Sequence, residues 1–584
     1  MSEATAATET RSASISEGAV SESAVSESAA SENAVAESAV SESAVADGAE
    51  AVDAVVVGAG FAGLYMLHRL RAQGLRVIVF EAGDDVGGTW YWNRYPGARV
   101  DVECINYSFS FSSELEQDYP WAERYAPQPE ILRYARHVAD RFGLRRDIRF
   151  GTRVTAARYD EPSRTWRVQA DRGGAVTARY FVMATGCLSA AKLPEIPGTD
   201  TFRGESYHTA HWPHEGVDFS GLRVGLIGTG SSGVQSIPVI AEQAADLTVF
   251  QRTPAYSLPA RNRPLHPGEL EGVQARYGEW RQAARVSGFG VPVADPTKSA
   301  LEVSEQERNA TLEEAWNAGA LTSLLTCYTD TSTSQQANDL IREFIHGKIR
   351  ELVKDPQTAA DLCPQYPVGT KRPCLDTGYY DTYNRDNVHL VNLRRTPLAA
   401  VTERGIRTSE REYEFDAIVY ATGFDAMTGA LTRVDIRGRD GASLQDEWQA
   451  GPRTYLGIAS AGFPNLFMIT GPGSPSVLSN MMISIEQHVD WVADTIAHLG
   501  QRGLAAIEPT RQAQDDWVDH VNEVASYTLF PKANSWYMGA NVPGKPRVFM
   551  PYAGGVGNYR VKCDEVAANG YEGFTLDPGG GHSA

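Results

Sequence analysis

Cysteine is scarce in this sequence, and no stretch is apolar enough to cross a membrane. The longest run of apolar residues and glycine, residues 54–67, is too short and too glycine-rich for a membrane span. The N-terminus also lacks the basic flank and apolar core of a secretory signal. No CxxC pair and no cluster with histidine at metal-ligand spacing occurs, which argues against a disulfide scaffold, a zinc module or another metal site. The six cysteines are Cys104, Cys187, Cys327, Cys363, Cys374 and Cys563.

Positive charge is also in short supply. The 584 residues carry 53 lysines and arginines against 73 acidic side chains, which gives a formal net charge of −20. This balance argues against non-specific binding to nucleic acid or to anionic membranes. Hydrophobic residues make up 42% of the chain, enough for a sizeable core. We therefore predict a soluble, cytoplasmic protein of several domain-sized units.

The first 50 residues form an acidic leader. They contain ten acidic side chains and one basic side chain, and residues 16–45 repeat a five-residue pattern of small, polar and acidic residues. A period of five builds no apolar face on a helix or on a strand, and the segment has no aromatic residue. We therefore predict a disordered, solvated leader, with a tail that docks to a partner as the alternative.

The composition changes near residue 51, where apolar, β-branched runs begin to alternate with helical patterns. This alternation predicts an α/β fold. Residues 265–362 are charged, helical in pattern and poor in β-branched runs, so we expect them to form a helical insertion.

The first nucleotide motif begins with a buried strand, residues 54–57, that runs into Gly58-x-Gly60-x-x-Gly63 and then into a helix. The glycines permit a tight turn, close approach of a pyrophosphate and close packing of helix on strand, and the helix N-terminus then faces the phosphates. The next strand ends at Glu81, 18 residues after Gly63, the spacing at which a carboxylate reaches an adenosine ribose. This site therefore suits FAD or NAD.

A second motif repeats the pattern but ends in different side chains. A strand leads into Gly228-x-Gly230-x-x-Gly233, and Arg252 and Thr253 follow the next strand, with 19 residues from Gly233 to Arg252. A cation and a hydroxyl bind a ribose 2′-phosphate that a carboxylate would repel, so this site suits NADP. The alternative is an ordinary surface arginine at position 252. The other loop residues that we expect at this cofactor are Thr229, Ser231 and Ser232.

Two nucleotide sites in one chain indicate electron transfer between two cofactors, most simply from NADPH to a flavin. Two strands are each followed by an Ala-Thr-Gly turn, at 184–186 and 421–423, where the chain can cross between domains. We predict two Rossmann-like dinucleotide-binding domains, with the FAD domain split by the NADP domain. The predicted ranges are the leader at 1–50, FAD parts at 51–196 and 425–584, and the NADP domain at 197–424.

The segment between the glycine motifs indicates oxygen chemistry. No cysteine pair accompanies the flavin motif, so a disulfide reductase is excluded. Residues Phe202-x-Gly204-x-x-x-His208-x-x-x-Trp212-Pro213 match the FxGxxxHxxxWP fingerprint of type I Baeyer–Villiger monooxygenases. The sequence resembles this family from about residue 51 to 575, and within it the phenylacetone, cyclohexanone and steroid monooxygenase branch. The resemblance makes His208 a linker and conformational element rather than an acid or base.

The resemblance also implies the site residues. Arg372 would be the catalytic arginine, which stabilises anions during oxygen transfer, and Asp101 would orient it. The alternative for these two residues is a plain interdomain ion pair. Val477 stands where the phenylacetone enzyme has a smaller alanine, and Trp536 resembles the tryptophan of a mobile loop that closes over NADP. The implied contacts are Thr89, Trp90, Asp101, Tyr107 and Val154 for FAD, Lys371, Arg372 and Trp536 for NADP, and Ser476, Val477, Leu478 and Met481 for the substrate.

The family's activity is implied as well: a monomer uses FAD, NADPH and O2 to convert a ketone into an ester or lactone. With its acidic leader, the sequence resembles the bacterial pentalenolactone-pathway monooxygenases. That resemblance implies a tricyclic sesquiterpenoid keto acid, such as 1-deoxy-11-oxopentalenate, as substrate in antibiotic biosynthesis. Two alternatives stay open. One is a flavin N- or S-oxygenase, whose fingerprint usually has Tyr or Phe in place of Trp212, and the other is a flavoprotein that binds or senses without turnover.

Overall fold

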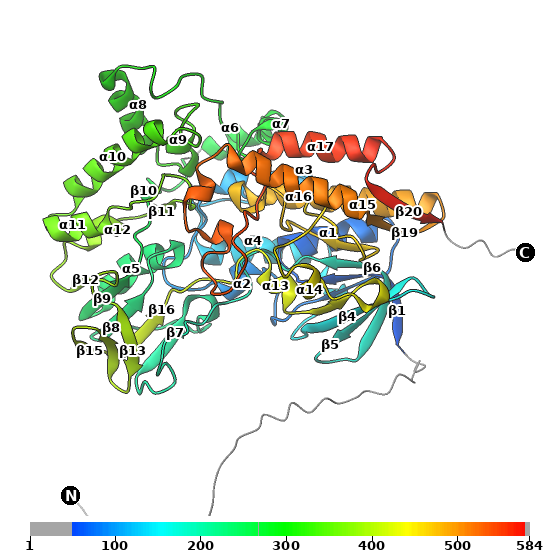
Figure 1. The fold of residues 1–584 in the computed structure, drawn as a ribbon, viewed down its shortest axis with the longest axis horizontal. Helices are drawn as coiled ribbons and strands as arrows, with labels where there is room; N and C mark the ends of the chain where they lie inside the picture. The colour runs from blue at the N-terminus through cyan, green and yellow to red at the C-terminus, as the bar shows by residue number, and fades with distance from the viewer. Residues whose placement is uncertain (1–48, 267, 579–584) are drawn as a thin grey trace, which may run out of the picture. The chain divides into compact units, whose positions relative to one another are not determined.

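The computed structural model of the chain describes residues 49–266 and 268–578. The predicted disordered leader lies outside this range, apart from its last two residues. The described part has the predicted α/β fold, built on two sheets whose central strands are parallel (Figure 1). Within these residues no helix is long and apolar enough to cross a membrane, and no group of three acidic, histidine or cysteine side chains could hold a metal ion.

The first sheet has eight strands and joins two distant parts of the chain. Its central strands β1, β2 and β6 are parallel, with Val57 level with both Phe80 and Met183. The ends of these strands are apolar and buried, as expected for parallel strands covered on both faces. The strands are β1 (Glu50–Val57), β2 (Val77–Phe80), β3 (Ile148–Arg149), β4 (Val154–Asp160), β5 (Thr165–Ala170), β6 (Ala175–Met183), β17 (Asp435–Arg437) and β18 (Leu466–Met468).

The second sheet has five parallel strands in the order β12-β9-β8-β16-β7. These strands are β7 (Glu205–His208), β8 (Arg223–Ile227), β9 (Asp246–Gln251), β12 (Val388–Asn392) and β16 (Ala417–Tyr420). After β16 the chain returns to the first sheet, because β17 pairs with β4 and β18 pairs with β6. The predicted domain boundaries themselves stay predictions.

Helix α1 (Phe61–Ala72) follows the first glycine loop and packs against α15 (Met481–Gln501), which is far away in the sequence. The Tyr65 hydroxyl donates to Asp490 Oδ1 at 2.7 Å, and Arg69 Nη2 donates to Asp494 Oδ1 at 2.8 Å. Helix α15 also contacts α17 (Val556–Ala568), so most of its side chains are buried. The C-terminal part of the chain therefore packs over helix α1.

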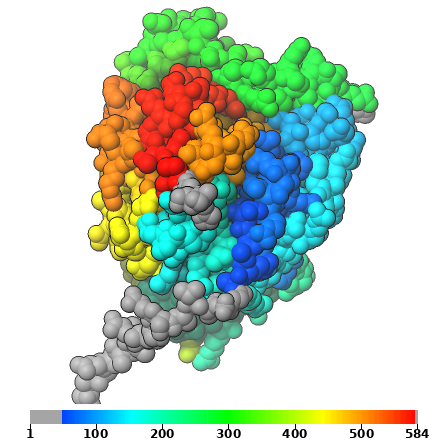
Figure 2. Space-filling model, turned by 90° about the vertical axis from the view of Figure 1, so that its right-hand side faces the viewer, coloured from blue at the N-terminus to red at the C-terminus, as the bar shows by residue number. Residues whose placement is uncertain are grey.

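The residues between β10 (Ser257–Pro259) and β11 (Cys374–Asp376) fold into helices, and their described part contains no strand. Side-chain oxygens of Ser304, Ser334 and Asp355 cap the starts of α8, α10 and α11. Figure 2 shows part of this green segment beside the red α17, in agreement with the contacts between α7 and α17. The helices are α6 (Glu269–Gln274), α7 (Tyr277–Val286), α8 (Glu305–Ala318), α9 (Leu321–Leu325), α10 (Gln335–Leu352) and α11 (Pro356–Leu362).

Gly63 lies where α1 packs on β1, and a side chain there would separate the two elements. A Cβ on Gly63 would lie 1.8 Å from the carbonyl oxygen of Gly58, whereas a Cβ on Gly347 in α10 would meet no atom within 4 Å. We expect Gly63→Ala to lower the melting temperature by more than about 5 °C, because backbone must shift. Gly347→Ala should leave it unchanged or raise it. Equal melting temperatures for the two variants would contradict this account of Gly63.

Candidate active site

The first glycine loop leaves the start of α1 open to a ligand. The Cβ positions of Gly58 and Gly63 are blocked by backbone, at 2.7 Å from Ala184 O and 1.8 Å from Gly58 O. At Gly60 the nearest atom to a Cβ would be Gly88 Cα at 3.4 Å, and no side chain caps the helix. The first backbone N–H groups of α1 therefore lack a side-chain partner, which fits a pyrophosphate at this end.

Glu81 occupies the predicted position at the end of β2 but also has a structural task. Its Oε2 accepts from the backbone N–H of Ala59 and its Oε1 accepts from that of Gly83, both at 2.7 Å. The side chain is buried, and burial raises the pKa of this carboxyl. Glu81 thus fastens the glycine loop to β2, and its oxygens keep further lone pairs for hydroxyl donors.

The predicted flavin contacts fall in two places. The Trp90 indole N–H donates to the Tyr107 hydroxyl at 3.2 Å, and the two rings meet edge to face. Thr89 begins the helix α2 (Thr89–Trp92) and is exposed. Val154 belongs to a different buried cluster, together with Val57 and Phe80. Two residues before it, the Thr152 N–H donates to Glu81 O at 2.8 Å, so β4 begins near the end of β2.

The second glycine loop has the same form as the first. Helix α5 (Ser231–Gln243) has no side-chain cap, and a Cβ on Gly230 would meet nothing within 4 Å, whereas one on Gly233 would lie 2.2 Å from Gly228 O. The buried Thr229 donates from its hydroxyl to Thr253 O at 3.1 Å. Ser231 lies next to the Cys374 thiol, and Ser232 follows it in the first turn of α5. This end of α5 is therefore open to a second pyrophosphate.

Basic side chains gather beside this loop. Arg252 is exposed at the end of β9, and Lys371 arrives from the segment after the helical insertion. Lys371 Nζ lies 4.6 Å from the centre of the Tyr366 ring. Burial and the neighbouring Arg252 and Arg394 lower the pKa of Lys371 to about 8. Arg252 is therefore near enough to Lys371 to disfavour its charged form, an effect that a bound anion would offset.

Arg372 and Asp101 form a bidentate ion pair. Arg372 Nε donates to Asp101 Oδ2 at 2.6 Å, and Nη2 donates to Oδ1 at 2.9 Å. A third bond runs from Nη1 to the backbone carbonyl of Val477 at 2.8 Å. Burial alone would lower the pKa of Arg372, but the Asp101 carboxylate raises it above its ordinary value. The guanidinium therefore stays charged at every pH at which the protein is folded.

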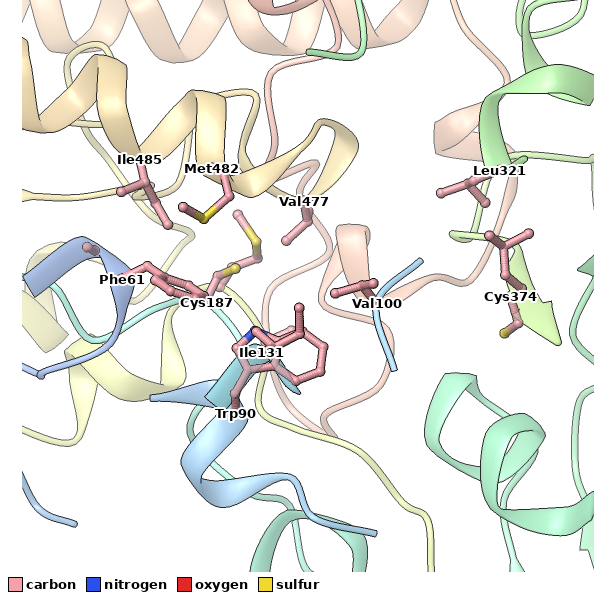
Figure 3. Close-up of a cluster of buried hydrophobic side chains, with 14 of the residues drawn as sticks. Phe61, Trp90, Val100, Ile131, Cys187, Leu321, Cys374, Val477, Met482 and Ile485 are labelled. Carbon is pink, nitrogen blue, oxygen red and sulfur yellow. The ribbon is translucent and has the colours of Figure 1, made fainter. Parts of the chain in front are cut away.

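An apolar region lies beside Val477, whose carbonyl accepts from Arg372. Figure 3 shows Trp90, Cys187, Val477 and Met482 turned toward a common region of the interior. Ser476, Val477 and Leu478 form a single turn of 3₁₀-helix directly before α15, which begins at Met481. The Ser476 hydroxyl is buried and has no hydrogen-bond partner among the described residues.

Several side chains of this apolar region were missed in the sequence. They are Phe61, Cys187, Met482 and Ile485. The sequence did contain a signal that could have placed Cys187 in this region, because the residue directly follows the Ala-Thr-Gly turn after β6. Burial raises the pKa of its thiol to about 12, so Cys187 is neutral and acts as a small apolar residue.

The fingerprint residues lie where the chain passes between the two sheets, and His208 hydrogen-bonds there to Lys192 and Thr422 rather than to Arg372. His208 Nδ1 accepts from the backbone N–H of Ala210, so its Nε2 carries the proton and faces Lys192 O and Thr422 Oγ1, both at 3.1 Å. Burial lowers the pKa of His208 and keeps it neutral. His208 thus ties together the two segments that connect the sheets, residues 184–204 between β6 and β7 and residues 421–434 between β16 and β17. This agrees with a linker rather than an acid or base.

The other fingerprint residues pack this region. Trp212 is buried against Tyr207 and Phe219, and Pro213 follows it. A Cβ on Gly204 would lie 2.4 Å from Asp416 O, so only glycine lets β7 enter beside β16. Phe202 packs against the apolar cluster on the outer face of the second sheet.

Trp536 belongs to a loop that lies across the same two connecting segments. The Trp536 and Tyr537 rings are 4.3 Å apart, and Tyr537 is buried. Asn541 Nδ2 donates to Phe424 O at 2.6 Å, and the Asn541 carbonyl accepts from Lys192 Nζ. Lys545 Nζ pairs with Asp425 Oδ1 at 2.6 Å. These contacts attach residues 535–545 to both connecting segments, and none of them was evident in the sequence.

Comparison with known proteins agrees with this geometry. A family model described as flavin-binding monooxygenase-like matches residues 51–263. A Baeyer-Villiger monooxygenase of Pseudooceanicola batsensis is 45% identical over 530 residues, which cover 90% of this chain and 96% of that protein. Cyclohexanone 1,2-monooxygenase of Acinetobacter is 40% identical, and phenazine N-monooxygenase PhzNO1 of Lysobacter antibioticus is 42% identical, each over 526 residues, 90% of this chain and 96% of the relative.

Solved structures give the same result. An oxidized steroid monooxygenase bound to NADP superposes with a TM-score of 0.87 at 55% identity. OTEMO in complex with FAD and NADP superposes with a TM-score of 0.87 at 41% identity. Each comparison covers 91% of this chain and 100% of the solved chain.

Each of the two sheets has parallel central strands and ends in a glycine loop that is open to a nucleotide. Together with the comparisons, this defines a flavoprotein with two dinucleotide sites. The chain belongs to the flavin-binding monooxygenase-like family, and its close relatives there include a Baeyer–Villiger monooxygenase, a cyclohexanone monooxygenase and a steroid monooxygenase. It is an NADPH-dependent flavoprotein monooxygenase, and the predicted cofactors FAD and NADP are confirmed. The predicted fold class is confirmed by the same superpositions.

The ion pair of Lys545 makes the attachment of the Trp536 loop testable. The Lys545 and Asp425 side chains are 10% and 25% exposed, so their charge-assisted hydrogen bond contributes about 1.5–3 kcal/mol to the attachment of the loop. We expect Lys545→Ala to speed amide hydrogen exchange at residues 535–545 by about tenfold or more. Arg203→Ala is the control, because the Arg203–Glu403 pair is 76% and 59% exposed and contributes little. Unchanged exchange in the Lys545 variant would contradict the assigned attachment.

Proposed function

We propose that this chain is a Baeyer–Villiger monooxygenase that inserts one oxygen atom of O2 beside a ketone carbonyl. The observation that carries the proposal is the Arg372 guanidinium, which Asp101 holds charged and which donates to the carbonyl of Val477. Val477 turns toward the same apolar region as Trp90 and Met482 (Figure 3). Oxygen insertion into a ketone passes through an anionic tetrahedral adduct, which needs a fixed cation in surroundings that exclude water. The pair Asp101–Arg372 supplies that cation.

The residues on both loops fit the two cofactors. For FAD we assign the open end of α1 to the pyrophosphate, Glu81 to the ribose, and Trp90 with Tyr107 to the flavin ring, with Thr89 and Val154 as further contacts. For NADP we assign the open end of α5 to the pyrophosphate, and Arg252, Thr253 and Lys371 to the 2′-phosphate, with Trp536 closing over it. Together, bound FAD and NADPH supply hydride transfer and oxygen activation.

Arg372 then has two N–H groups left for the reacting atoms. A guanidinium carries five N–H donors, and three of them are engaged by Asp101 and by the Val477 carbonyl. One N–H therefore remains on each terminal nitrogen, and both can donate to an oxyanion formed from the carbonyl. Because Asp101 and Val477 already fix the group, little reorganisation is needed when that charge develops.

The substrate that we propose is a cyclic ketone, which would yield a lactone. Cyclohexanone 1,2-monooxygenase is among the relatives, and the turn Ser476–Leu478 with Met481 would shape the pocket. Among cyclic ketones we propose a tricyclic sesquiterpenoid keto acid such as 1-deoxy-11-oxopentalenate, in antibiotic biosynthesis, to which the sequence resemblance points. We also propose that the protein acts as a monomer.

Flavin-dependent N-oxygenation is the second candidate, because a phenazine N-monooxygenase is 42% identical to this chain. A panel of cyclic ketones and heteroaromatic or tertiary amines separates the two functions. With NADPH and O2, mass spectrometry should find a ketone product heavier by one oxygen that hydrolyses as a lactone. N-oxides without any lactone would overturn the proposal in favour of the second candidate.

Arg372→Ala tests the role of the guanidinium. We expect reduction of the flavin by NADPH to persist, while ketone oxygenation falls by about 10²–10³-fold, because one fixed oxyanion donor group is lost. Arg372→Lys should restore only part of the rate, since lysine keeps the charge but not the fork of donors. Stopped-flow absorbance and product analysis measure both steps. Normal lactone formation by the alanine variant would remove Arg372 from the mechanism.

Arg252→Ala tests the cofactor assignment. We expect the KM for NADPH to rise about 10–100-fold, because a charge-assisted contact to the 2′-phosphate is lost, and the KM for NADH to change less than twofold. Steady-state oxidation of the two cofactors by the flavin-loaded protein measures this difference. Equal losses for both cofactors would assign Arg252 to structure rather than to the 2′-phosphate.

A further inference from the structure

Arg394 lies at the same sheet edge as Arg252. Strand β12 pairs in parallel with β9, with Asn392 level with Gln251, and the Leu393 N–H donates to Gln251 O at 2.8 Å. Both strands therefore end side by side, and the chain leaves each of them at the same edge. Arg252 directly follows β9, and Arg394 stands two residues beyond β12.

The Arg394 side chain turns toward the predicted NADP residues. Its Nη2 donates to Thr253 Oγ1 at 3.4 Å. Because this hydroxyl accepts from Arg394, its own hydrogen is free to donate elsewhere. Arg394 is also one of the two cations that lower the pKa of Lys371. Arg252 and Arg394 therefore share one sheet edge, and both act on the charge of Lys371, which comes from a third segment.

In the part of the chain that the structure describes, these three cations form no ion pair. Within residues 49–266 and 268–578, none of them lies within 4.0 Å of an acidic side chain. The neighbouring Arg395 differs, because both of its terminal nitrogens donate to the Asp361 carboxylate. Three unpaired cations close together repel one another, and a bound dianion would turn that repulsion into attraction.

We propose that Arg394 is a third cationic contact of the ribose 2′-phosphate and a determinant of the preference for NADPH over NADH. A guanidinium suits this role because its fork of donors matches two phosphate oxygens. Arg394 also orients the Thr253 hydroxyl toward the same group. The inference rests on the proposed function in one respect, namely that this sheet edge receives the 2′-phosphate of NADPH.

The test compares two nucleotides that differ only in the 2′-phosphate. Calorimetric titration of the flavin-loaded protein with adenosine 2′,5′-bisphosphate and with adenosine 5′-monophosphate needs no ketone and no turnover. In Arg394→Ala we expect binding of the bisphosphate to weaken about tenfold, while binding of the monophosphate changes less than twofold. The KM for NADPH should rise by a similar factor, and that for NADH should not.

Arg395→Ala is the matched control. It removes the adjacent arginine and one positive charge, but this side chain is already paired with Asp361. We expect both nucleotides to bind to it as they bind to the unaltered protein. A loss of the bisphosphate preference in Arg395→Ala equal to that in Arg394→Ala would show a general charge effect and overturn the specific contact.

The outcomes separate this inference from the function on which it rests. If the unaltered protein prefers the bisphosphate and Arg394→Ala keeps the full preference, Arg394 is not a contact, although the NADPH site stands. If the unaltered protein shows no preference at all, the 2′-phosphate site itself is wrongly placed. If Arg394→Ala weakens both nucleotides equally, the residue supports the loop rather than the phosphate.

Discussion

The ion pair between Arg372 and Asp101 is the interaction on which the site depends. Burying a guanidinium without a partner costs several kcal/mol, and a bidentate carboxylate offsets that cost while keeping the charge. Asp101 follows the first glycine loop, Arg372 follows the helical insertion, and Val477 precedes α15. The pair and its third hydrogen bond to Val477 O therefore form only when these three distant segments are held together. Replacing such a partly buried pair by apolar residues is often neutral or stabilising, so a gain in stability does not by itself explain why the pair is there.

The connecting segments supply that fixed geometry. Lys192 is central, because its carbonyl accepts from His208 Nε2 and from the Thr422 hydroxyl, while its ammonium group donates to the loop that carries Trp536. A neutral His208 suits this position, since it donates at one nitrogen and accepts at the other. The fingerprint histidine therefore helps to fix how the two sheets and the Trp536 loop meet.

The sequence predicted the features that depend on residues close together in the chain. Glycine spacing, a preceding apolar strand and a following helix place Gly58, Gly228 and Glu81 without any tertiary information, because strand, turn and helix are consecutive. The pairing of Asp101 with Arg372 spans 271 residues, and only family resemblance indicated it. Arg394 and Arg395 look alike in the sequence, and only the pairing of β12 with β9 and the position of Asp361 distinguish them. Non-local strand pairing is what single-sequence patterns do not encode.

The charge distribution explains why several cations are needed at one phosphate. The body of the chain, residues 51–584, carries 63 acidic and 52 basic side chains, so its mean field disfavours an anionic cofactor. At physiological ionic strength the screening length is about 8 Å, so distant lysines and arginines cannot correct this locally. Only cations within that distance of the phosphate count, and those paired with carboxylates count little. In the site proposed for NADP, Arg252, Lys371 and Arg394 are cations without a carboxylate partner among the described residues, whereas Glu81 supplies an acid at the loop proposed for FAD, whose ribose carries no 2′-phosphate. Under the proposed assignment, the sign of the side chains that follow the second strand of each motif distinguishes the two dinucleotides.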